Sequence, residues 1–170
     1  FLSALELNNL LEVGSNIGNQ LLLLSKKGYK NLYGIEINQY AVDKAKERVR
    51  GKKIKIAIGS AYNIPFKDAS FDLVFTSGVL IHISPQDIGY VLDEIYRCSK
   101  RYIWGLEYFS NDYVEVNYRG YKELLWKTNF AKLYLDKFPD LRLVKERRYP
   151  YREDKKLVDH VFLLEKVGIH

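Results

Sequence analysis

The sequence predicts one α/β domain built on a mostly parallel seven-stranded sheet, with an antiparallel hairpin at its C-terminal end. Three observations lead to this prediction. Short, continuously apolar runs alternate with helical patterns through the first two thirds of the chain, as βαβ units around a parallel sheet require. Glycines close the first two helical patterns, at Gly28 and Gly51. The last two apolar runs are separated only by a loop, so we expect them to pair with each other.

The expected strands are the short apolar runs, namely Leu10–Val13, Asn31–Ile37, Lys53–Ile58, Phe71–Thr76, Arg101–Leu106, Leu141–Tyr149 and Val158–Glu165. The expected helices between them are Asn19–Lys27, Tyr40–Arg50 and Pro85–Cys98. An aromatic-rich insertion at about 108–139 separates the fifth strand from the sixth and includes a helical pattern at Tyr121–Phe138. No repeat or linker divides the chain, so residues 1–170 are expected to form a single domain.

Composition and charge restrict the classes of protein to which this chain can belong. The single cysteine, Cys98, rules out a disulfide framework within the chain and predicts a cytoplasmic location. No apolar run approaches the roughly 20 residues of a membrane helix, so no membrane partner is expected. The net charge of +6 is spread out, and it permits an acidic partner without requiring nucleic acid. Because the chain starts at Phe1 and contains no methionine, we expect a preceding segment to be missing.

The segment LLEVGSNIGN, residues 10–19, places glycines between an apolar strand and a helix. Such a turn lets the backbone approach a ligand and points free N–H groups toward it. The dinucleotide pattern G-x-G-x-x-G matches this segment only at its first glycine. The pattern G-x-G-x-G matches better, at Gly14 and Gly18 with Asn16 in the middle, and Glu12 adds an acid before the first glycine. A glycine-rich turn without a ligand is the alternative that this segment alone leaves open.

Glu36 stands at the end of the second expected strand, in the segment GIEIN. A carboxylate about 20 residues after a glycine loop can accept hydrogen bonds from both hydroxyls of a ribose. A surface carboxylate at a strand end is a common alternative. The spacing favours the ribose-binding role.

The run A-x-x-I-P-F-x-D-x-S-F-D-L-V, from Ala61 to Val74, resembles the signature of the type 11 methyltransferases. That resemblance implies a Rossmann-like class I methyltransferase fold, S-adenosylmethionine as the cofactor, S-adenosylhomocysteine as the product and no metal. Carried over by position, it implies cofactor contacts from Glu12, Gly14, Ser15, Asn16, Gly18, Glu36, Ile37, Ser60, Ala61, Tyr62, Ser77, Gly78 and Val79. Many members have an aspartate where Ser60 stands, so a serine hydroxyl would have to take over that contact to the adenine amino group.

Five further segments resemble a narrower group, the methylases associated with pseudaminic acid biosynthesis. These segments are TSGVLIHI (Thr76–Ile83), EIYRCSKRYI (Glu94–Ile103), EYFS (Glu107–Ser110), VNYRGYKELLWK (Val116–Lys127) and LYLDKFPDLRLV (Leu133–Val144). The resemblance implies a small-molecule acceptor, an acidic or nucleotide-linked sugar of surface-glycan biosynthesis.

Methyl transfer from a sulfonium mainly requires that the acceptor be positioned and water excluded, but a hydroxyl or amine acceptor also needs a base. His82, after the fourth strand, is the predicted base, although a lone histidine is often only packed or exposed. Glu107 and Tyr108 should reach the same edge, because ligands bind outside the carboxyl ends of parallel strands. Glu107 would orient the acceptor or simply cap its strand.

The insertion is the predicted acceptor side, because it combines aromatic rings with positive charge. The predicted acceptor-binding residues are Tyr118, Arg119, Trp126 and Lys127. The alternative is that the insertion forms a helix face packed on the sheet. His160 and His170 lie away from this edge and are expected to be structural or disordered.

Other functions fit the sequence less well. Amino-methylating DNA enzymes have a proline-containing motif where this chain reads TSGV, and Cys98 ends a helix rather than standing in a nucleophile motif. The basic residues Arg142, Lys145, Arg147, Arg148 and Arg152 keep an RNA substrate open, without an RNA-binding module beside them. An RNA or protein methyltransferase and a non-catalytic cofactor-binding protein are therefore the alternatives. The sequence does not determine the oligomeric state.

Overall fold

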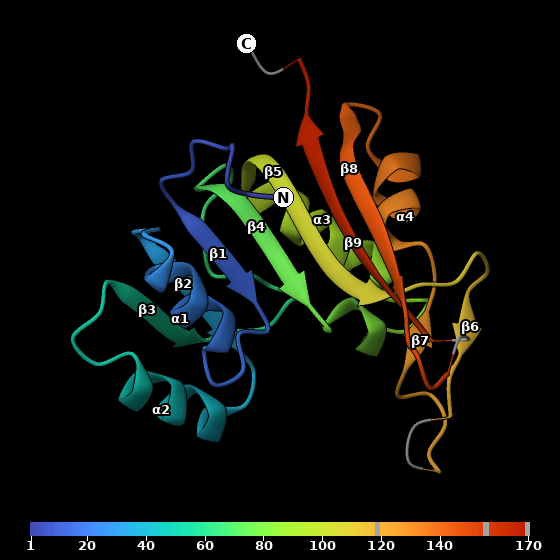
Figure 1. Ribbon diagram of the computed structural model, residues 1–170, viewed down its shortest axis with the longest axis horizontal. Coiled ribbons are helices and arrows are strands. Elements are labelled where there is room, and N and C mark those ends of the chain that lie inside the picture. The colour runs from blue at the N-terminus through green and yellow to red at the C-terminus, as the bar shows by residue number, and fades with distance from the viewer. Residues whose placement is uncertain (118–119, 155–156, 169–170) are drawn as a thin grey trace.

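The computed structural model describes residues 1–117, 120–154 and 157–168, and it contains a seven-stranded sheet in the order β3-β2-β1-β4-β5-β9-β8 (Figure 1). Its strands are β1 (Leu10–Val13), β2 (Leu32–Glu36), β3 (Ile54–Ile58), β4 (Phe71–Ser77), β5 (Ser99–Tyr108), β8 (Leu141–Pro150) and β9 (Val158–Lys166). The first five of these strands pair in parallel, whereas β9 is antiparallel to both β5 and β8. The predicted parallel sheet with a C-terminal antiparallel hairpin is therefore confirmed.

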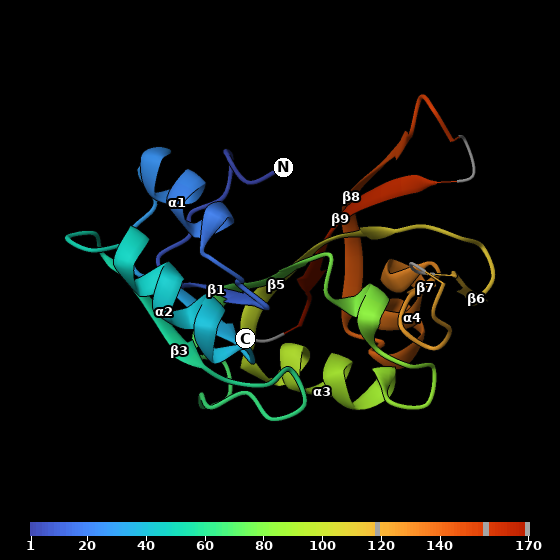
Figure 2. The ribbon, with the colours of Figure 1, turned by 90° about the horizontal axis from the view of Figure 1, so that it is seen from below.

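Helices cover both faces of the sheet, as the buried parallel strands require. The helices are α1 (Asn19–Lys26), α2 (Gln39–Arg48), α3 (Ile88–Cys98) and α4 (Phe130–Lys137). Figure 2 shows α1 and α2 on one face and α3 and α4 on the other. Successive residues of β4 alternate between the two cores: Leu73 packs in the α1–α2 core, and Val74 packs in the α3–α4 core. Burying each such side chain stabilises the fold by about 1.5–3 kcal/mol.

The insertion differs from the expectation, because the helix predicted at Tyr121–Phe138 starts only at Phe130. The residues before it form a small antiparallel pair, β6 (Val114–Glu115) with β7 (Trp126–Lys127). Asn129 ends this non-helical part, since its side chain accepts a hydrogen bond from the Lys132 N–H at 3.1 Å and so caps the helix. The prediction was wrong because the residues before Asn129 pair as strands and the Asn129 cap sets the start of the helix.

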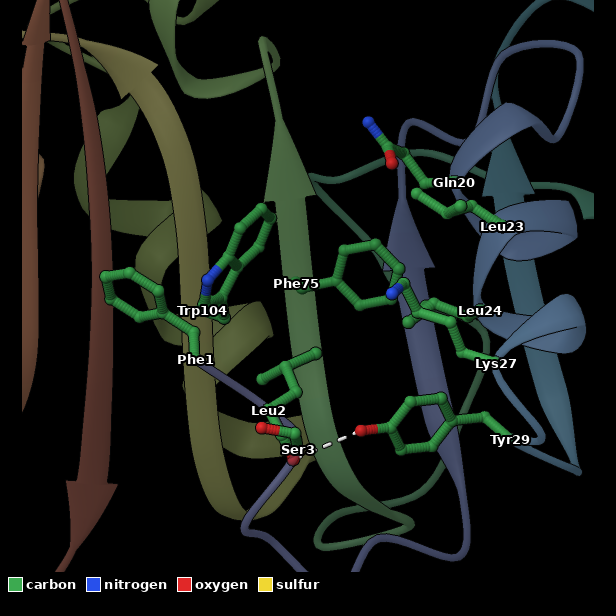
Figure 3. A pocket seen from close by; sticks show the side chains of 10 residues that line it. All are labelled: Phe1, Leu2, Ser3, Gln20, Leu23, Leu24, Lys27, Tyr29, Phe75 and Trp104. Carbon is green, nitrogen blue, oxygen red and sulfur yellow. Dashed lines mark hydrogen bonds between the residues drawn. The ribbon is translucent and has the colours of Figure 1, made fainter.

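The first residues of the chain cross the face of the sheet on which α1 lies. The Tyr29 hydroxyl donates a hydrogen bond to the Leu2 carbonyl at 3.1 Å and so ties this segment to the loop after α1. Phe1, Phe75 and Trp104 help to line a cavity of about 650 Å³ on this face (Figure 3). This cavity shares no lining residue with the cleft described below.

The remaining histidine and cysteine predictions concern packed residues. His160, on β9, is 1% exposed, and its Nε2 lies 2.7 Å from a carboxylate oxygen of Glu146. Cys98 is buried at the end of α3. Both side chains are therefore packed in the fold, while His170 lies outside the described residues. The expectation that His160 lies away from the carboxyl edge was wrong, because β9 places it opposite Glu107 near the end of β5. Among the described residues, no helix combines the length and apolar character needed to cross a membrane.

Candidate cofactor site

A cleft of about 380 Å³ opens at the carboxyl ends of β1, β2, β3 and β4. It is lined by Gly14, Asn16, Glu36, Ile37, Gly59, Ser60, Ala61, Tyr62, Ser77, Gly78, Val79, His82 and Ile83. Four loops that lie far apart in the sequence therefore meet at one edge of the sheet. This is the edge at which ligands bind in open α/β sheets.

The loop after β1 follows a path that explains its glycines. Gly14 has a φ of 75°, and a Cβ placed there would lie 2.4 Å from Val79 Cγ2. Only glycine therefore lets this loop approach the segment after β4 so closely. Asn16 has a φ of 45°, in the left-handed region that asparagine tolerates better than most residues. The departure from the glycine pattern at position 16 is thus compatible with the same turn.

Glu36 joins two walls of the cleft. Its Oε2 accepts a hydrogen bond from the Asn16 N–H at 2.9 Å, and its Oε1 accepts one from the Asn38 N–H at 2.9 Å. The carboxylate is half-buried at the end of β2, and it lines the cleft. Each carboxylate oxygen can accept a further hydrogen bond, so Glu36 can hold this loop and bind a ligand at the same time.

Glu12, Ser15 and Gly18 lie next to the cleft without lining it. Glu12 is 3% exposed and Ser15 is also 3% exposed; neither Glu12 Oε2 nor Ser15 Oγ has a hydrogen-bond partner among the described residues. Burial, with a smaller contribution from the Glu36 charge, raises the pKa of Glu12 to about 8. Gly18 caps α1 with a φ of 78°. The loop therefore covers two buried oxygen atoms that could each bond to a polar ligand.

The segment after β3 is held in place by an ion pair between two residues of α3. The Arg97 guanidinium donates to the carbonyls of Ile64 and Phe66 at 3.0 and 2.7 Å and to Asp68 Oδ1 at 2.8 Å. Arg97 also donates two bonds of 2.8 Å to Glu94, which in turn accepts from the Ile64 N–H at 2.7 Å. The I-P-F-x-D run is therefore held in place just beyond Ser60, Ala61 and Tyr62, which line the cleft.

Replacing Arg97 with alanine should lower the free energy of unfolding by about 1.5–3 kcal/mol, the range for hydrogen bonds to charged groups. The loss arises because Glu94 and two backbone carbonyls of the adjoining segment lose their donor. Lys132→Ala is the matched control, since it breaks only an exposed pair with Asp136 and should cost about 0.5 kcal/mol or less. Urea denaturation measures the free energy of unfolding of both variants. Equal losses would show that Arg97 does not hold the segment after β3 in place.

The segment after β4 contributes Ser77, Gly78 and Val79, then the short 3₁₀ turn η1 (Leu80–His82). His82 is exposed to the cleft, and its Nδ1 lies 2.8 Å from the Leu124 carbonyl oxygen. A carbonyl oxygen can only accept, so Nδ1 carries the proton, and Nε2 is the basic nitrogen of the neutral ring. The Tyr113 hydroxyl also donates to the Ile83 carbonyl at 3.4 Å. The insertion therefore orients the histidine that the sequence singled out.

The other predicted catalytic residues do not line the cleft. Glu107 is 2% exposed, and its carboxylate accepts hydrogen bonds from backbone N–H groups of the segment after β4. Tyr108 is half-buried, with its ring edge-on to Tyr151 at 6.4 Å between centroids. The structure thus brings His82 to the cleft but places Glu107 underneath one wall and Tyr108 beside the C-terminal hairpin.

The four predicted acceptor-binding residues are also separated. Trp126, on β7, is 9% exposed and so presents little of its ring to solvent. Lys127 is half-buried on the same strand. Tyr118 and Arg119 lie outside the described residues. An acceptor-binding role for these four residues stays a prediction.

Two lining residues, Gly59 and Ile83, were missed by sequence reasoning. Gly59 directly follows β3, and a Cβ there would lie 3.1 Å from Ile35 Cβ. A glycine at that strand end was a signal for close backbone packing. Ile83 closes the LIHI run and had no signal, because a buried isoleucine looks like any other core residue.

Comparison with known proteins decides the family. Residues 11–102, more than half of the chain, match the family described as a methyltransferase domain. The chain belongs to the methyltransferase domain family. The matched range extends from β1 into β5 and so contains all four loops that line the cleft.

Individual relatives of this methyltransferase domain are distant from it in sequence. A demethylmenaquinone methyltransferase from Lactobacillus johnsonii is 34% identical over 111 residues, which are 61% of this chain and 44% of that protein. The chain thus spans less than half the length of these curated relatives, among them a phosphoethanolamine N-methyltransferase from Plasmodium falciparum, of which it covers 39%.

Solved structures show the same fold. A SAM-dependent methyltransferase from Methanosarcina mazei superposes with a TM-score of 0.78 at 20% identity, over 96% of this chain and 94% of that one. The 1,6-didemethyltoxoflavin-N1-methyltransferase from Burkholderia thailandensis, solved with bound 1,6-didemethyltoxoflavin and S-adenosylhomocysteine, superposes with a TM-score of 0.76 at 16% identity, over 94% of this chain and 71% of that one. The fold is therefore the Rossmann-like methyltransferase fold predicted from the sequence.

The residues of the cleft fit S-adenosylmethionine. Its ribose needs an acceptor of hydroxyl protons, for which Glu36 is placed at the end of β2. Its methionine part carries an ammonium group, and Glu12, whose pKa burial raises to about 8, has a buried oxygen without a hydrogen-bond partner among the described residues, a group that an ammonium ion would stabilise in its ionised form. The glycine at position 14 lets the loop after β1 pack against Val79, so that both segments line the cleft. Polar groups and space thus match the chemistry of this cofactor.

Proposed function

We propose that this methyltransferase domain transfers a methyl group from S-adenosylmethionine to a small-molecule acceptor. The observation that carries the proposal is the cleft in which the loops after β1, β2, β3 and β4 meet, with Glu36 and His82 both lining it. When bound, S-adenosylmethionine supplies an activated methyl group on a sulfonium. Glu36 would bind the ribose, Glu12 the ammonium group, and the segment at Ser60–Tyr62 the adenine.

His82 serves as the base in this proposal. An acceptor hydroxyl or amine would give up its proton to Nε2 of His82 as the acceptor atom receives the methyl group. The hydrogen bond from Nδ1 to the Leu124 carbonyl keeps the ring in the tautomer that this step needs. Because that carbonyl belongs to the insertion, the insertion both orients the base and borders the acceptor side.

Within small molecules, the acceptor to test first is an acidic or nucleotide-linked sugar. Support comes from the resemblance to the methylases associated with pseudaminic acid biosynthesis. Lys127 supports it too, as a cation on the insertion near the turn that carries His82. The relatives act on other small molecules, since one is named for demethylmenaquinone and another was solved with 1,6-didemethyltoxoflavin. A small acceptor, rather than RNA or protein, is what these names favour.

Isothermal titration with S-adenosylmethionine, S-adenosylhomocysteine and NAD tests the assignment of the cofactor. We expect heat and thermal stabilisation from the first two ligands and none from NAD, because the glycine loop lacks the dinucleotide spacing. No binding of either S-adenosyl compound would refute the proposed function. Screening free and nucleotide-linked acidic sugars with radiolabelled S-adenosylmethionine then identifies the acceptor. Cofactor binding without transfer to any compound in such a screen would favour the non-catalytic alternative.

A further inference from the structure

Glu107 is a buried carboxylate placed under the wall of the cleft that follows β4. Its Oε2 accepts hydrogen bonds from the backbone N–H of Val79 at 3.1 Å and of Ile81 at 3.4 Å, and its Oε1 lies 3.3 Å from the Val79 nitrogen. Val79 lines the cleft and also packs against the glycine loop at Gly14. His82 follows in the same turn. A single side chain therefore fixes the backbone that shapes the cleft and carries the predicted base.

The groups that face Glu107 from the packed elements carry little compensating charge. Thr76 on β4 donates a side-chain hydrogen bond to it, and Tyr134 on α4 is a fully buried neutral hydroxyl nearby. His160 lies opposite in the register of β9, but its Nε2 is bonded to Glu146. Burial outweighs the hydrogen bonds and raises the pKa of Glu107 to about 7. The carboxyl group therefore changes its charge near neutral pH.

A carboxylate in this position is costly for a purely structural role. Burying an ionised group without an opposite charge is unfavourable, and a neutral acceptor could bond to backbone N–H groups at a smaller cost. Because the folded protein holds the proton of Glu107 more tightly than the unfolded chain does, stability falls as the pH rises from about 4.5 to about 7. The ionised form thus costs stability while it strengthens the bonds to the turn.

We propose that Glu107 is a positioning residue whose ionised carboxylate holds the Val79–His82 turn in the shape that binds the cofactor, and whose protonation releases that turn. The proposal rests on the assignment of the cleft to S-adenosylmethionine. Protonation removes the negative charge from the group that accepts from the Val79 and Ile81 amides, so their charge-assisted hydrogen bonds become weaker neutral ones, and the added O–H must point away from these N–H donors. Glu107 acts through the turn and does not touch the reacting atoms.

The proposal predicts that cofactor affinity falls as the pH falls through about 7. At pH 6 roughly a tenth of Glu107 would be ionised, so with an uncharged form that binds about tenfold more weakly, the affinity for S-adenosylhomocysteine should be about fivefold weaker than its limiting value. Glu107→Gln keeps the shape of the side chain but cannot ionise. It should bind S-adenosylhomocysteine about tenfold more weakly than the wild type at pH 8 and lack the step near pH 7. Glu12 titrates in both proteins, so only the difference between the two pH profiles counts.

Amide chemical shifts report on the turn without any ligand. In the ¹⁵N-labelled wild type, the Val79 and Ile81 amide resonances should shift between pH 5.5 and 8.5 with an inflection near pH 7. Glu107→Gln should abolish the inflection, and Glu107→Asp, which keeps an ionisable carboxyl, should retain one. His82→Gln is the matched control, because it removes the neighbouring imidazole and should leave the inflection in place.

The outcomes separate this role from the proposed function. Amide resonances that do not titrate in the wild type, or that titrate equally in Glu107→Gln, would overturn the role of Glu107. Equal affinities of wild type and Glu107→Gln for S-adenosylhomocysteine at pH 8 would overturn it as well. No binding of S-adenosylhomocysteine at any pH, with the amide titration intact, would instead overturn the assignment of the cleft. Thermal unfolding of each variant checks that all of them are folded.

Discussion

Replacing Glu36 with alanine is expected to weaken the binding of S-adenosylmethionine and S-adenosylhomocysteine by about tenfold to a hundredfold. The loss of one charge-assisted hydrogen bond from a ribose hydroxyl costs about 1.5–3 kcal/mol, every 1.4 kcal/mol is roughly a factor of ten in affinity, and a second such bond would add to the loss. The same change removes the acceptor of the Asn16 and Asn38 N–H groups, which should loosen the glycine loop. Isothermal titration calorimetry measures the affinity of each ligand.

Glu47→Ala provides the control for the Glu36 prediction. Glu47 is an exposed carboxylate on the neighbouring helix α2, where it pairs with Lys44 at 3.0 Å. Its removal changes the charge of the domain equally but touches no residue of the cleft, so affinity should stay within about twofold, as expected of a screened surface charge. Unchanged affinity in Glu36→Ala would refute the ribose-binding role. Glu36→Gln, which keeps one acceptor for the loop, should fall between the two.

Replacing His82 with alanine is expected to lower turnover by about a hundredfold to ten-thousandfold, the usual contribution of a positioned general base. Affinity for S-adenosylhomocysteine should change little, because the backbone of the turn that carries His82 is held by Glu107 and not by the imidazole. Turnover is measured with radiolabelled S-adenosylmethionine and an acceptor from the screen, and affinity by calorimetry. A loss confined to turnover distinguishes a base from a residue that supports the cleft.

Tyr113→Phe controls for the second role of His82, which is to tie the insertion to the turn. Tyr113 makes a similar tie, since its hydroxyl donates to the Ile83 carbonyl at 3.4 Å, but it brings no basic nitrogen to the cleft. If the variant His82→Ala loses activity only because the insertion moves, Tyr113→Phe should lose activity to a similar extent. Full activity of His82→Ala would show that the reaction needs no base at this position.

Much of the fold and of the cleft could be predicted because both depend on local patterns. Buried parallel strands read as short apolar runs, and the loops at their carboxyl ends must meet at one edge of the sheet. Once the strands were placed, the positions of Gly14, Glu36 and Ser77 near one another followed from topology alone. The resemblance at Ala61–Val74 then identified the chemistry of that edge.

The insertion was harder to predict because its structure depends on packing. The helical pattern at residues 121–129 competes with the β6–β7 pairing. This pairing buries Trp126, which is only 9% exposed. A short two-residue strand has no periodicity that a sequence could reveal. The cap at Asn129 was the one local signal that marked where the helix begins.

The sequence by itself determined the parallel sheet, the glycine loop and the carboxylate at the end of β2, because each depends on neighbours within one strand–turn–helix unit. Only the tertiary structure decided what Glu107 and His82 contact. Glu107 meets the Val79 amide across 28 positions of sequence, and His82 meets the Leu124 carbonyl across 42. Such contacts form only when distant segments pack together, so the sequence could predict His82 at this edge but not its hydrogen bond to the insertion or the place of Glu107 beneath the cleft.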